Sequence, residues 1–222
     1  MINHANGSEE IFDVLGRSRV VLAFPGAAGC IEAGVDRYIE VREQPTTVEA
    51  NARDVISLFR STGLRVAPVV DMDAWLRRHA VFVTAAAGAI YEAGSDSQRL
   101  ALDREGISTF ILAMREGWSA LDRRGVKSAS LALRTIFCWA PLPYAIGYWR
   151  RLFGSVRGEF YFARHIRHAP GEMAALAADV RGLLDDMPTP CLDRLYVAIK
   201  QAVANPRAVN RAAERQSTHK EV

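Results

Sequence analysis

The sequence predicts an α/β portion followed by a larger, mostly α-helical portion. Strand and helix patterns alternate over residues 1–70, whereas residues 71–204 show helical patterns and no convincing strand. Half of the 222 residues are hydrophobic, which is enough for a substantial core. Residues 205–222 lack an apolar stripe, so we expect them to form a flexible tail.

The expected α/β portion contains short strands and one clear helix. The run RVVLAF at residues 19–24 is β-branched and apolar, and Pro25-Gly26 ends it. Residues 36–43 alternate polar and apolar types, and residues 64–70 form a further strand. A helix at residues 48–63 would place four apolar side chains on one face: Val55, Ile56, Leu58 and Phe59. About three strands and one or two helices are too few for a self-covered parallel sheet.

Helical patterns separated by glycine and proline fill the second portion. We expect helices at residues 72–93, 96–124, 128–140, 143–153, 159–168, 171–186 and 190–204. The first is apolar on every side over residues 80–91, which predicts a buried helix that neighbours approach closely at its alanines and at Gly88. Asp71 and Asp73 at its start are expected to cap the helix rather than to catalyse.

Charge and hydropathy argue against nucleic-acid and membrane partners. The net charge of +3 comes from 28 basic and 25 acidic residues that are spread along the chain, without a basic stripe of interleaved aromatics. The longest apolar runs, residues 80–91 and 135–149, are shorter than the roughly 18 residues that cross a bilayer. The N-terminus lacks a signal-peptide pattern and the three cysteines form no CxxC pair, so we expect a cytoplasmic protein without a zinc site.

The start of the helix at residues 72–93 carries the first candidate site residues. Arg77, Arg78 and His79 lie in its N-terminal turns, beside the junction of the two portions, and ligand clefts usually open at such junctions. The alternative is a helix end that simply faces water. Thr84 stands alone in apolar surroundings, where it would either contact a substrate or bond a carbonyl one turn earlier.

The order of these motifs resembles that of the ketopantoate reductases (2-dehydropantoate 2-reductases). Residues 3–29, NHANGSEEIFDVLGRSRVVLAFPGAAG, are similar to the family's asparagine-glycine turn, helix and strand. Residues 71–94, DMDAWLRRHAVFVTAAAGAIYEAG, are similar to the helix that opens its C-terminal domain. Residues 165–196, HIRHAPGEMAALAADVRGLLDDMPTPCLDRLY, resemble its last long helices. The resemblance extends to about residue 204. It depends on the order of the motifs and on their general residue patterns rather than on invariant signatures.

The resemblance implies a fold, a cofactor and a substrate. Residues 1–70 would be the C-terminal part of a Rossmann-like domain, and residues 71–204 the helical domain of the family. NADPH would deliver a hydride to the carbonyl of a 2-oxo acid such as 2-dehydropantoate, while a cation stabilises the developing alkoxide. The sequence begins about where the family's first four or so strands have ended, so the resemblance implies either a truncated form or a partner polypeptide that supplies those strands. A homodimer is the other expected assembly.

The resemblance also implies roles for particular residues. Asn6 matches the turn asparagine near the cofactor, and Glu172 matches the family's glutamate. Arg78, or Arg77 in a shifted alignment, stands where the family has its lysine, and arginine is a poor proton donor. His79 would then be the acid, because an imidazole with an ordinary pKa transfers protons near neutrality. The two helix asparagines of the family fall at Phe82 and Ala86.

One departure from the family is large. A dinucleotide site needs a strand and a GxGxxG turn that opens a helix, and the glycines of residues 26–34 lead instead into a strand. We therefore expect this chain alone to bind NADPH weakly or not at all. The alternative function is a catalytically silent helical module that dimerises or binds a small acid through Arg77 and Arg78.

A metal-dependent hydrolase is the third hypothesis. His165, His168 and Glu172 have i, i+3, i+7 spacing, and two histidines with a carboxylate are a known ligand set for catalytic metals. However, Pro170-Gly171 falls inside the triplet and should kink or stop the helix. We therefore predict no metal site here, and expect either a polar face of a cleft or plain surface.

Overall fold

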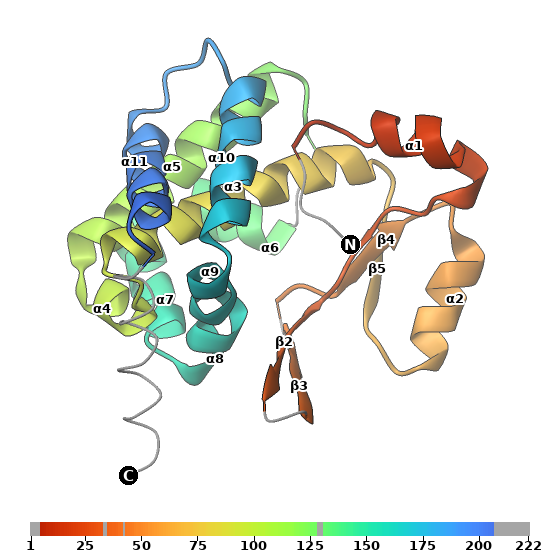
Figure 1. Ribbon diagram of the computed structural model, residues 1–222, viewed down its shortest axis with the longest axis horizontal. Helices are drawn as coiled ribbons and strands as arrows, with labels where there is room; N and C mark the ends of the chain where they lie inside the picture. Colours follow the sequence, from red (N-terminus) through yellow and green to blue (C-terminus); the bar gives the residue numbers. More distant parts are fainter. Residues whose placement is uncertain (1–4, 33–34, 42, 128–130, 207–222) are drawn as a thin grey trace.

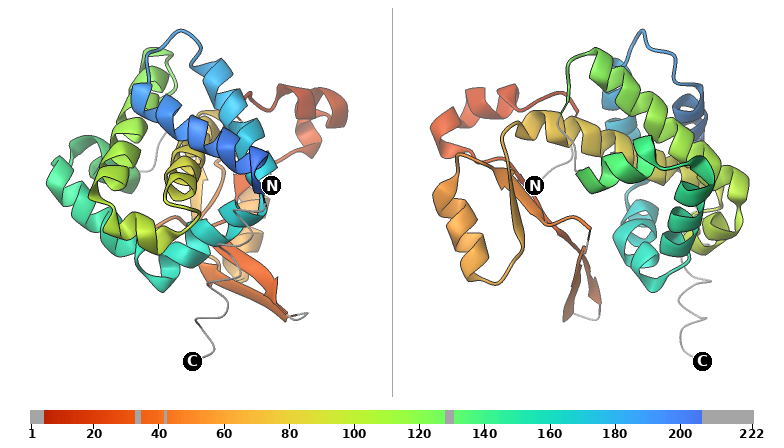
Figure 2. Two further views of the ribbon diagram at one scale, coloured as in Figure 1. Left: turned by 60° about the vertical axis from the view of Figure 1, so that its left-hand side comes forward. Right: turned by 180° about the vertical axis from the view of Figure 1, so that it is seen from behind.

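The computed structural model describes residues 5–32, 35–41, 43–127 and 131–206, and it has a small α/β part and a larger helical part (Figure 1). Helix α3 (Met72–Glu92) joins the two parts: its first turns adjoin the strands, and the rest runs through the helical part (Figures 1 and 2). The sequence-based expectation of an α/β portion followed by a helical portion is thus confirmed at this level.

The α/β part contains a mixed three-stranded sheet with the strand order β1-β4-β5. Strand β1 (Ala23–Phe24) is antiparallel to the central strand β4 (Thr46–Glu49), which is parallel to β5 (Val66–Val69). Helix α2 (Arg53–Ser61) connects β4 to β5. All four residues of β4 are buried, so this short strand is the centre of the sheet.

The remaining elements of the α/β part are an N-terminal helix and a hairpin. Helix α1 (Glu9–Leu15) follows a turn in which Gly7 has a φ of 95°, and a short 3₁₀ helix, η1 (Arg17–Arg19), follows α1. Strands β2 (Ala27–Glu32) and β3 (Val35–Glu40) pair as an antiparallel hairpin that extends from the three-stranded sheet (Figure 1).

Several expected boundaries in this part were wrong. The expected strand at residues 19–24 is reduced to β1, because η1 includes Arg19 and residues 20–22 belong to no regular element. The helix expected at 48–63 begins only at Arg53, since Thr46–Glu49 is a buried strand too short to show a period. Of the four apolar side chains assigned to one face of that helix, only Ile56 is buried, and Leu58 is 61% exposed.

Strand β5 is an edge strand whose backbone is poorly suited to further pairing. The carbonyls of Arg65 and Val69 accept hydrogen bonds from Thr46 and Ala50, so the alternate residues Val66 and Pro68 direct their backbone groups away from β4. Proline has no N–H to donate, and proline is one of the devices that keep an edge strand from recruiting another strand.

The helical part follows the expected helices with a few interruptions. Its elements are α4 (Ser97–Leu102), α5 (Arg104–Arg123), α6 (Leu131–Arg134), the π-helix η2 (Thr135–Trp139), α7 (Leu142–Phe153), α8 (Val156–Gly158), the π-helix η3 (Glu159–Ala163), α9 (Arg164–His168), α10 (Pro170–Leu183) and α11 (Pro190–Ala204). The helix expected at 96–124 is divided at Asp103, whose carboxylate accepts a hydrogen bond from the Gly106 amide and so caps α5. Pro170 begins a new helix, as its position in the sequence predicted.

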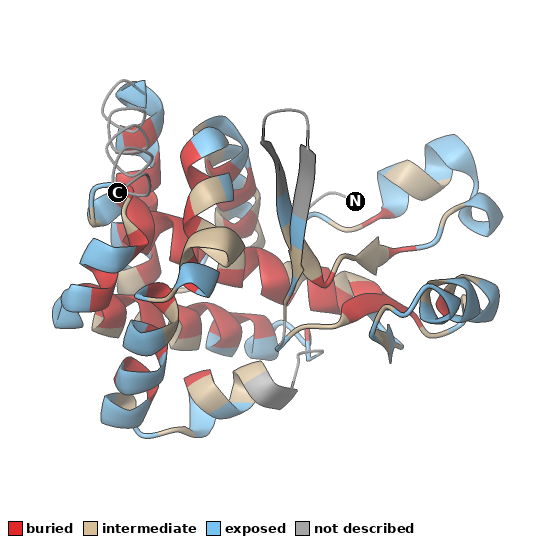
Figure 3. Cartoon of the chain, turned by 90° about the horizontal axis from the view of Figure 1, so that it is seen from below, coloured by how far each residue is buried: buried red, intermediate tan, exposed pale blue. Residues whose placement is uncertain are grey.

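The expected core helix is confirmed. Every residue from Ala80 to Tyr91 is buried except the partly buried Val83, and Figure 3 shows this stretch inside the helical part. Asp71 caps the helix by accepting a hydrogen bond from the Ala74 amide, 2.8 Å away. Within the residues that the structure describes, no helix has the length and apolar character needed to cross a bilayer. The expected tail lies outside the described residues from 207 onward.

Close approach of α3 and α11 depends on Gly88. A Cβ atom at Gly88 would lie 2.6 Å from both the Cβ and the carbonyl oxygen of Leu195, so α11 has no room to accept it without moving. We expect Gly88→Ala to lower the free energy of unfolding by about 1–3 kcal/mol, the usual cost of overpacking. Urea denaturation measures this change.

A matched control is Gly147 in the exposed face of α7, where a Cβ would meet nothing within 4 Å. Gly147→Ala should stabilise the protein by roughly 0.5–1 kcal/mol, because alanine loses less backbone entropy than glycine in a helix. Equal effects of the two substitutions would show that α3 and α11 are not packed as described.

Candidate functional site

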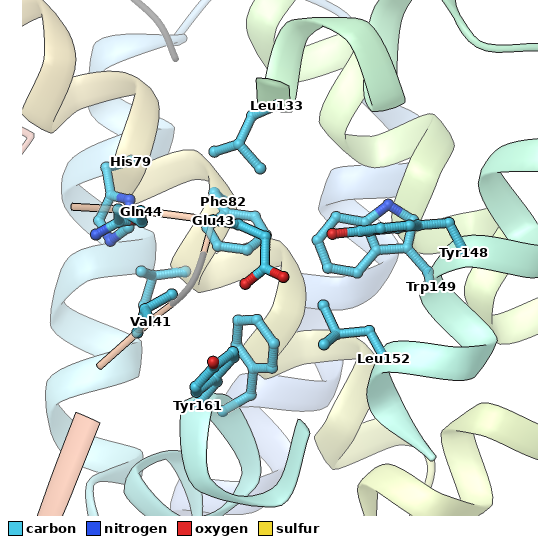
Figure 4. Close-up of a pocket in the computed structure, with 12 residues that line it drawn as sticks. Val41, Glu43, Gln44, His79, Phe82, Leu133, Tyr148, Trp149, Leu152 and Tyr161 are labelled. Atoms are coloured by element: carbon cyan, nitrogen blue, oxygen red, sulfur yellow. The ribbon is translucent and has the colours of Figure 1, made fainter. Parts of the chain in front are cut away.

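A pocket of about 100 Å³ lies where the α/β part meets the helical part, and we call it the junction pocket (Figure 4). One wall comes from the loop after β3 and from α3: Val41, Glu43, Gln44, His79, Phe82 and Val83. The other wall comes from α6, α7 and η3: Leu133, Tyr148, Trp149, Leu152, Tyr161 and Phe162. The pocket therefore gathers residues that are far apart in the sequence.

Two hydrogen bonds hold the loop after β3 at the mouth of this pocket. The hydroxyl of Tyr161 donates to the carbonyl oxygen of Glu40 at 3.3 Å, which links η3 to the end of the hairpin. The amide of Val41 donates to the carbonyl of Gly26 at 2.8 Å, which fixes the base of the hairpin. The loop that carries Glu43 and Gln44 is thus anchored to both parts of the protein.

The inner surface of the pocket is a continuous set of aromatic rings. The ring of Phe82 lies 5.8 Å from that of Trp149 and 5.7 Å from that of Phe162, and Trp149 and Phe162 are 6.4 Å apart. These separations are typical of tilted and edge-to-face aromatic pairs, which hold one another in place. The wall is apolar and fixed by the core behind it, where Phe110 and Phe137 contact Trp149.

His79 is a neutral, buried imidazole in this structure. Its ring stacks on Trp75 at 4.8 Å and lies 4.2 Å from the ring of Phe24 in β1. Desolvation by burial lowers the pKa of His79 to about 3. An imidazole that is neutral at pH 7 does not supply a proton as an imidazolium ion, so this conformation does not support the acid role expected for His79.

Two nitrogen atoms of pocket-lining side chains lack hydrogen-bond partners. Nδ1 of His79 and Nε1 of Trp149 are both buried, and neither has a partner among the described residues. Buried polar atoms in native proteins are nearly always hydrogen-bonded, and an unsatisfied one costs about 1–3 kcal/mol. Two such atoms at one pocket indicate that this region is not arranged for stability alone.

Arg78 belongs to the core rather than to the junction pocket. Its guanidinium group is 2% exposed, donates to the carboxylate of Asp122 and to the carbonyl of Val126, and lies 5.4 Å from the ring centre of Trp118. The indole N–H of Trp118 in turn donates to the carbonyl of Arg78 at 3.1 Å. The cation expected to stabilise an alkoxide is thus used to join α3 to the end of α5.

Thr84 is also a structural residue, and it does not line the junction pocket. It is fully buried, and its hydroxyl lies 2.8 Å from the carbonyl of Ala80, one turn earlier. The same hydroxyl is 2.9 Å from the hydroxyl of Tyr196 in α11. The alternative interpretation of Thr84, a bond to a carbonyl one turn back, is confirmed.

Asn6 and Arg77 lie together at a different place, where the N-terminal turn meets the start of α3. A Cβ atom on Gly7 would lie 3.0 Å from a terminal nitrogen of Arg77, so the guanidinium group packs against the turn. Asn6 is exposed, and two residues later the hydroxyl of Ser8 donates to the carboxylate of Asp73 at 2.6 Å. Neither Asn6 nor Arg77 lines the junction pocket.

Glu172 is on the surface of α10 and does not line the junction pocket. Its carboxylate lies 3.6 Å from Nε2 of His165, and both side chains are about half exposed. Nδ1 of His168 is 2.7 Å from the carbonyl of Arg164, so it does not face the other two groups. Among the described residues no set of three histidine, cysteine or acidic side chains is placed to hold a metal ion.

Sequence reasoning selected only one residue that lines the pocket for a site role, which is His79. The others were overlooked because Phe82 was compared only with an asparagine of the family, and because aromatic residues such as those of 137–153 are more often core than site. Phe137, Trp149 and Phe153 are indeed buried, while Tyr148 is 37% exposed at the pocket. The density of aromatic residues was the available signal.

No family model matches the chain, and neither a characterised protein nor a solved structure is significantly similar to it. The resemblance to the ketopantoate reductases therefore depends on the motifs quoted above.

The neutral state of His79 makes stability depend on pH. Between about pH 6.5 and 3 the unfolded chain takes up a proton that the folded protein excludes, so stability falls as the pH falls. From about pH 7.5 to about pH 5 this loss is about 2 kcal/mol. His79→Phe should remove that part of the pH dependence while keeping an aromatic ring beside Trp75, as chemical denaturation at the two pH values would show.

The matched control for this comparison is His165→Gln, because His165 is 56% exposed on the surface. This variant should keep the pH dependence of the wild type. If His79→Phe and wild type lose the same free energy between the two pH values, the imidazole of His79 is not excluded from water as described.

Removing either partner of the hydrogen bond between Thr84 and Tyr196 should lower the free energy of unfolding measurably. Thr84→Val should lower the free energy of unfolding by about 1–3 kcal/mol, because it leaves the buried hydroxyl of Tyr196 unpaired. Tyr196→Phe tests the other partner, and the double variant should cost less than the two single costs together. Additive costs would contradict the assignment of Thr84 to the core.

Proposed function

We propose that this protein binds a small molecule, inserting a compact apolar group of the ligand into the junction pocket. We also propose that the chain shares ancestry with the ketopantoate reductases, since the order of turn, helix, strands and long buried helix is the one that the resemblance implies. In this proposal the activity of the chain itself is ligand binding and not hydride transfer.

One observation carries the proposal: an aromatic pocket at the junction of two parts, with two unpaired nitrogen atoms on its lining side chains. Small-molecule sites are mostly apolar clefts with a few polar groups, and they often lie at such junctions. An apolar cavity of about 150 Å³ accommodates benzene. A pocket of about 100 Å³ with an open mouth therefore suits a ring or a branched alkyl group whose polar end remains near the surface.

The residues implied for hydride chemistry argue against catalysis by this pocket. Arg78 and Thr84 are engaged in the core, Glu172 is on the surface, and His79 is neutral. A charge that develops on a substrate oxygen in the pocket would meet no described cationic group there. Electrostatic stabilisation of that charge is usually the largest contribution to such catalysis.

The described strand-to-helix connections also argue against NADPH. Residues 50–52 connect β4 to α2 and residues 70–71 connect β5 to α3, and neither connection contains glycine. A pyrophosphate needs a glycine-rich turn so that it can approach the amides of a helix N-terminus. Among the described residues, neither of these two connections therefore offers the glycine-rich turn that would hold the pyrophosphate of NADPH.

Ligand-observed NMR with benzyl alcohol tests the proposed function. We expect saturable binding with a dissociation constant on the order of 1 mM, about −4 kcal/mol, as suits a ligand of this size. Leu152→Trp should abolish binding by filling the pocket, whereas Leu102→Trp, at a position 78% exposed and outside the pocket, should leave it unchanged.

Two results would contradict the proposal. The first is benzyl alcohol that does not bind, or that binds equally well to the Leu152→Trp variant. The second is tight binding of NADPH, at about 1 µM or below, with turnover of 2-dehydropantoate. That result would restore the reductase implied by the resemblance.

A further inference from the structure

The described lining of the junction pocket carries negative charge and no positive charge. Of the 12 described residues that line it, Glu43 alone carries a formal charge at neutral pH, and none is lysine or arginine. His79 adds no positive charge, because its burial keeps it neutral. The described lining thus offers negative charge and aromatic surface, and it offers no cation to balance a negatively charged ligand.

Figure 4 shows the carboxylate of Glu43 turned towards the side chains that enter from the opposite wall. Burial raises the pKa of Tyr148, and the nearby side chains of Glu43 and Tyr161 raise it further. The Tyr148 hydroxyl therefore stays protonated at neutral pH and adds no charge to the pocket.

The aromatic wall favours positive charge as well. The face of an aromatic ring is the negative end of its quadrupole, and cations bind over tryptophan and tyrosine faces in particular. Phe82, Trp149 and Phe162 form the inner wall, and Tyr148 and Tyr161 continue it to the mouth. Aromatic rings inside the pocket and a carboxylate at its mouth together form an environment that suits ammonium groups.

We propose, resting on the proposed function, that the ligand of the junction pocket is a compact arylalkyl or alkyl amine bound as its ammonium ion. The apolar group enters between Phe82, Trp149 and Leu152, and the ammonium group remains at the mouth. There it donates a charge-assisted hydrogen bond to the carboxylate of Glu43 and lies beside the rings of Tyr148 and Tyr161.

This ligand class differs from the 2-oxo acid that the resemblance implies. A carboxylate placed in the same pocket would face the carboxylate of Glu43 and the negative faces of the rings, without a described cation to pair with it. Like charges brought together in a partly desolvated site repel one another. This repulsion disfavours a carboxylate ligand, in addition to the attraction that favours an ammonium ligand.

The test compares three probes of similar size that differ in charge: benzylamine, benzyl alcohol and benzoate. We expect benzylamine to bind to the wild-type protein at least about tenfold more tightly than benzyl alcohol, a difference of about 1.4 kcal/mol. Benzoate should bind more weakly than benzyl alcohol. Ligand-observed NMR at low ionic strength and neutral pH measures all three, because screening by salt reduces the difference.

The substitution Glu43→Gln isolates the carboxylate. It should reduce the preference for benzylamine over benzyl alcohol, measured within the variant, to about twofold or less. A cooperative urea-unfolding transition like that of the wild type shows that the variant is folded. Glu10→Gln, at an exposed position in α1 outside the pocket, is the matched control and should keep the full preference.

Each outcome decides between the two proposals. Equal binding of the three probes, or a preference for benzylamine that survives Glu43→Gln, overturns this inference and leaves the proposed function standing. Tightest binding of benzoate overturns it as well, and a further Arg42→Gln variant then shows whether the sequence neighbour of Glu43 attracts the acid. Failure of all three probes to bind overturns the inference together with the proposed function.

Discussion

The whole arrangement depends on the close packing of helix α3 inside the helical part. Its alanines and Gly88 bring α11 so near that Leu195 touches the glycine backbone, and Gly117 of α5 makes a similar approach to Val81. Packing of this density leaves little freedom for a helix to rotate or slide. The N-terminal half of α3, which carries His79 and Phe82, therefore forms a rigid wall of the pocket.

Buried polar groups fix α3 as firmly as the apolar contacts do. Arg78 joins it to α5 through Asp122 and Val126, and Thr84 joins it to α11 through Tyr196. A charge buried this deeply is costly unless its partners are well placed, so removing a partner destabilises the protein. Polar residues such as Arg78 and Thr84 attract attention as site candidates in a sequence. In the folded protein they are buried and do not line the junction pocket.

The sequence predicted the parts of this account that depend on local patterns. The buried helix followed from its all-round apolar character, its cap from Asp71, and the break between α9 and α10 from Pro170. Strand β4 was not predictable in this way, because four buried residues show no period and gain their strand conformation from two neighbouring strands.

The pocket lay beyond sequence reasoning for a related reason. Its walls are formed by Val41, Glu43 and Gln44, by α3, and by side chains of α6, α7 and η3, and no spacing within one segment reveals that they adjoin. The charge state of His79 was equally hidden, since it depends on Phe24 and Trp75 closing around the ring. Only the abundance of aromatic residues could have been noticed, and aromatic residues are more often core than site.

Crystals of the protein under xenon pressure would test the central claim most directly, because xenon enters dry apolar cavities and is located by its own scattering. We expect a xenon atom among Phe82, Trp149 and Leu152, with the loop of Glu43 still at the mouth. Absence of xenon there, with the aromatic rings closed against one another, would contradict the claim that the two parts of the protein enclose a ligand site.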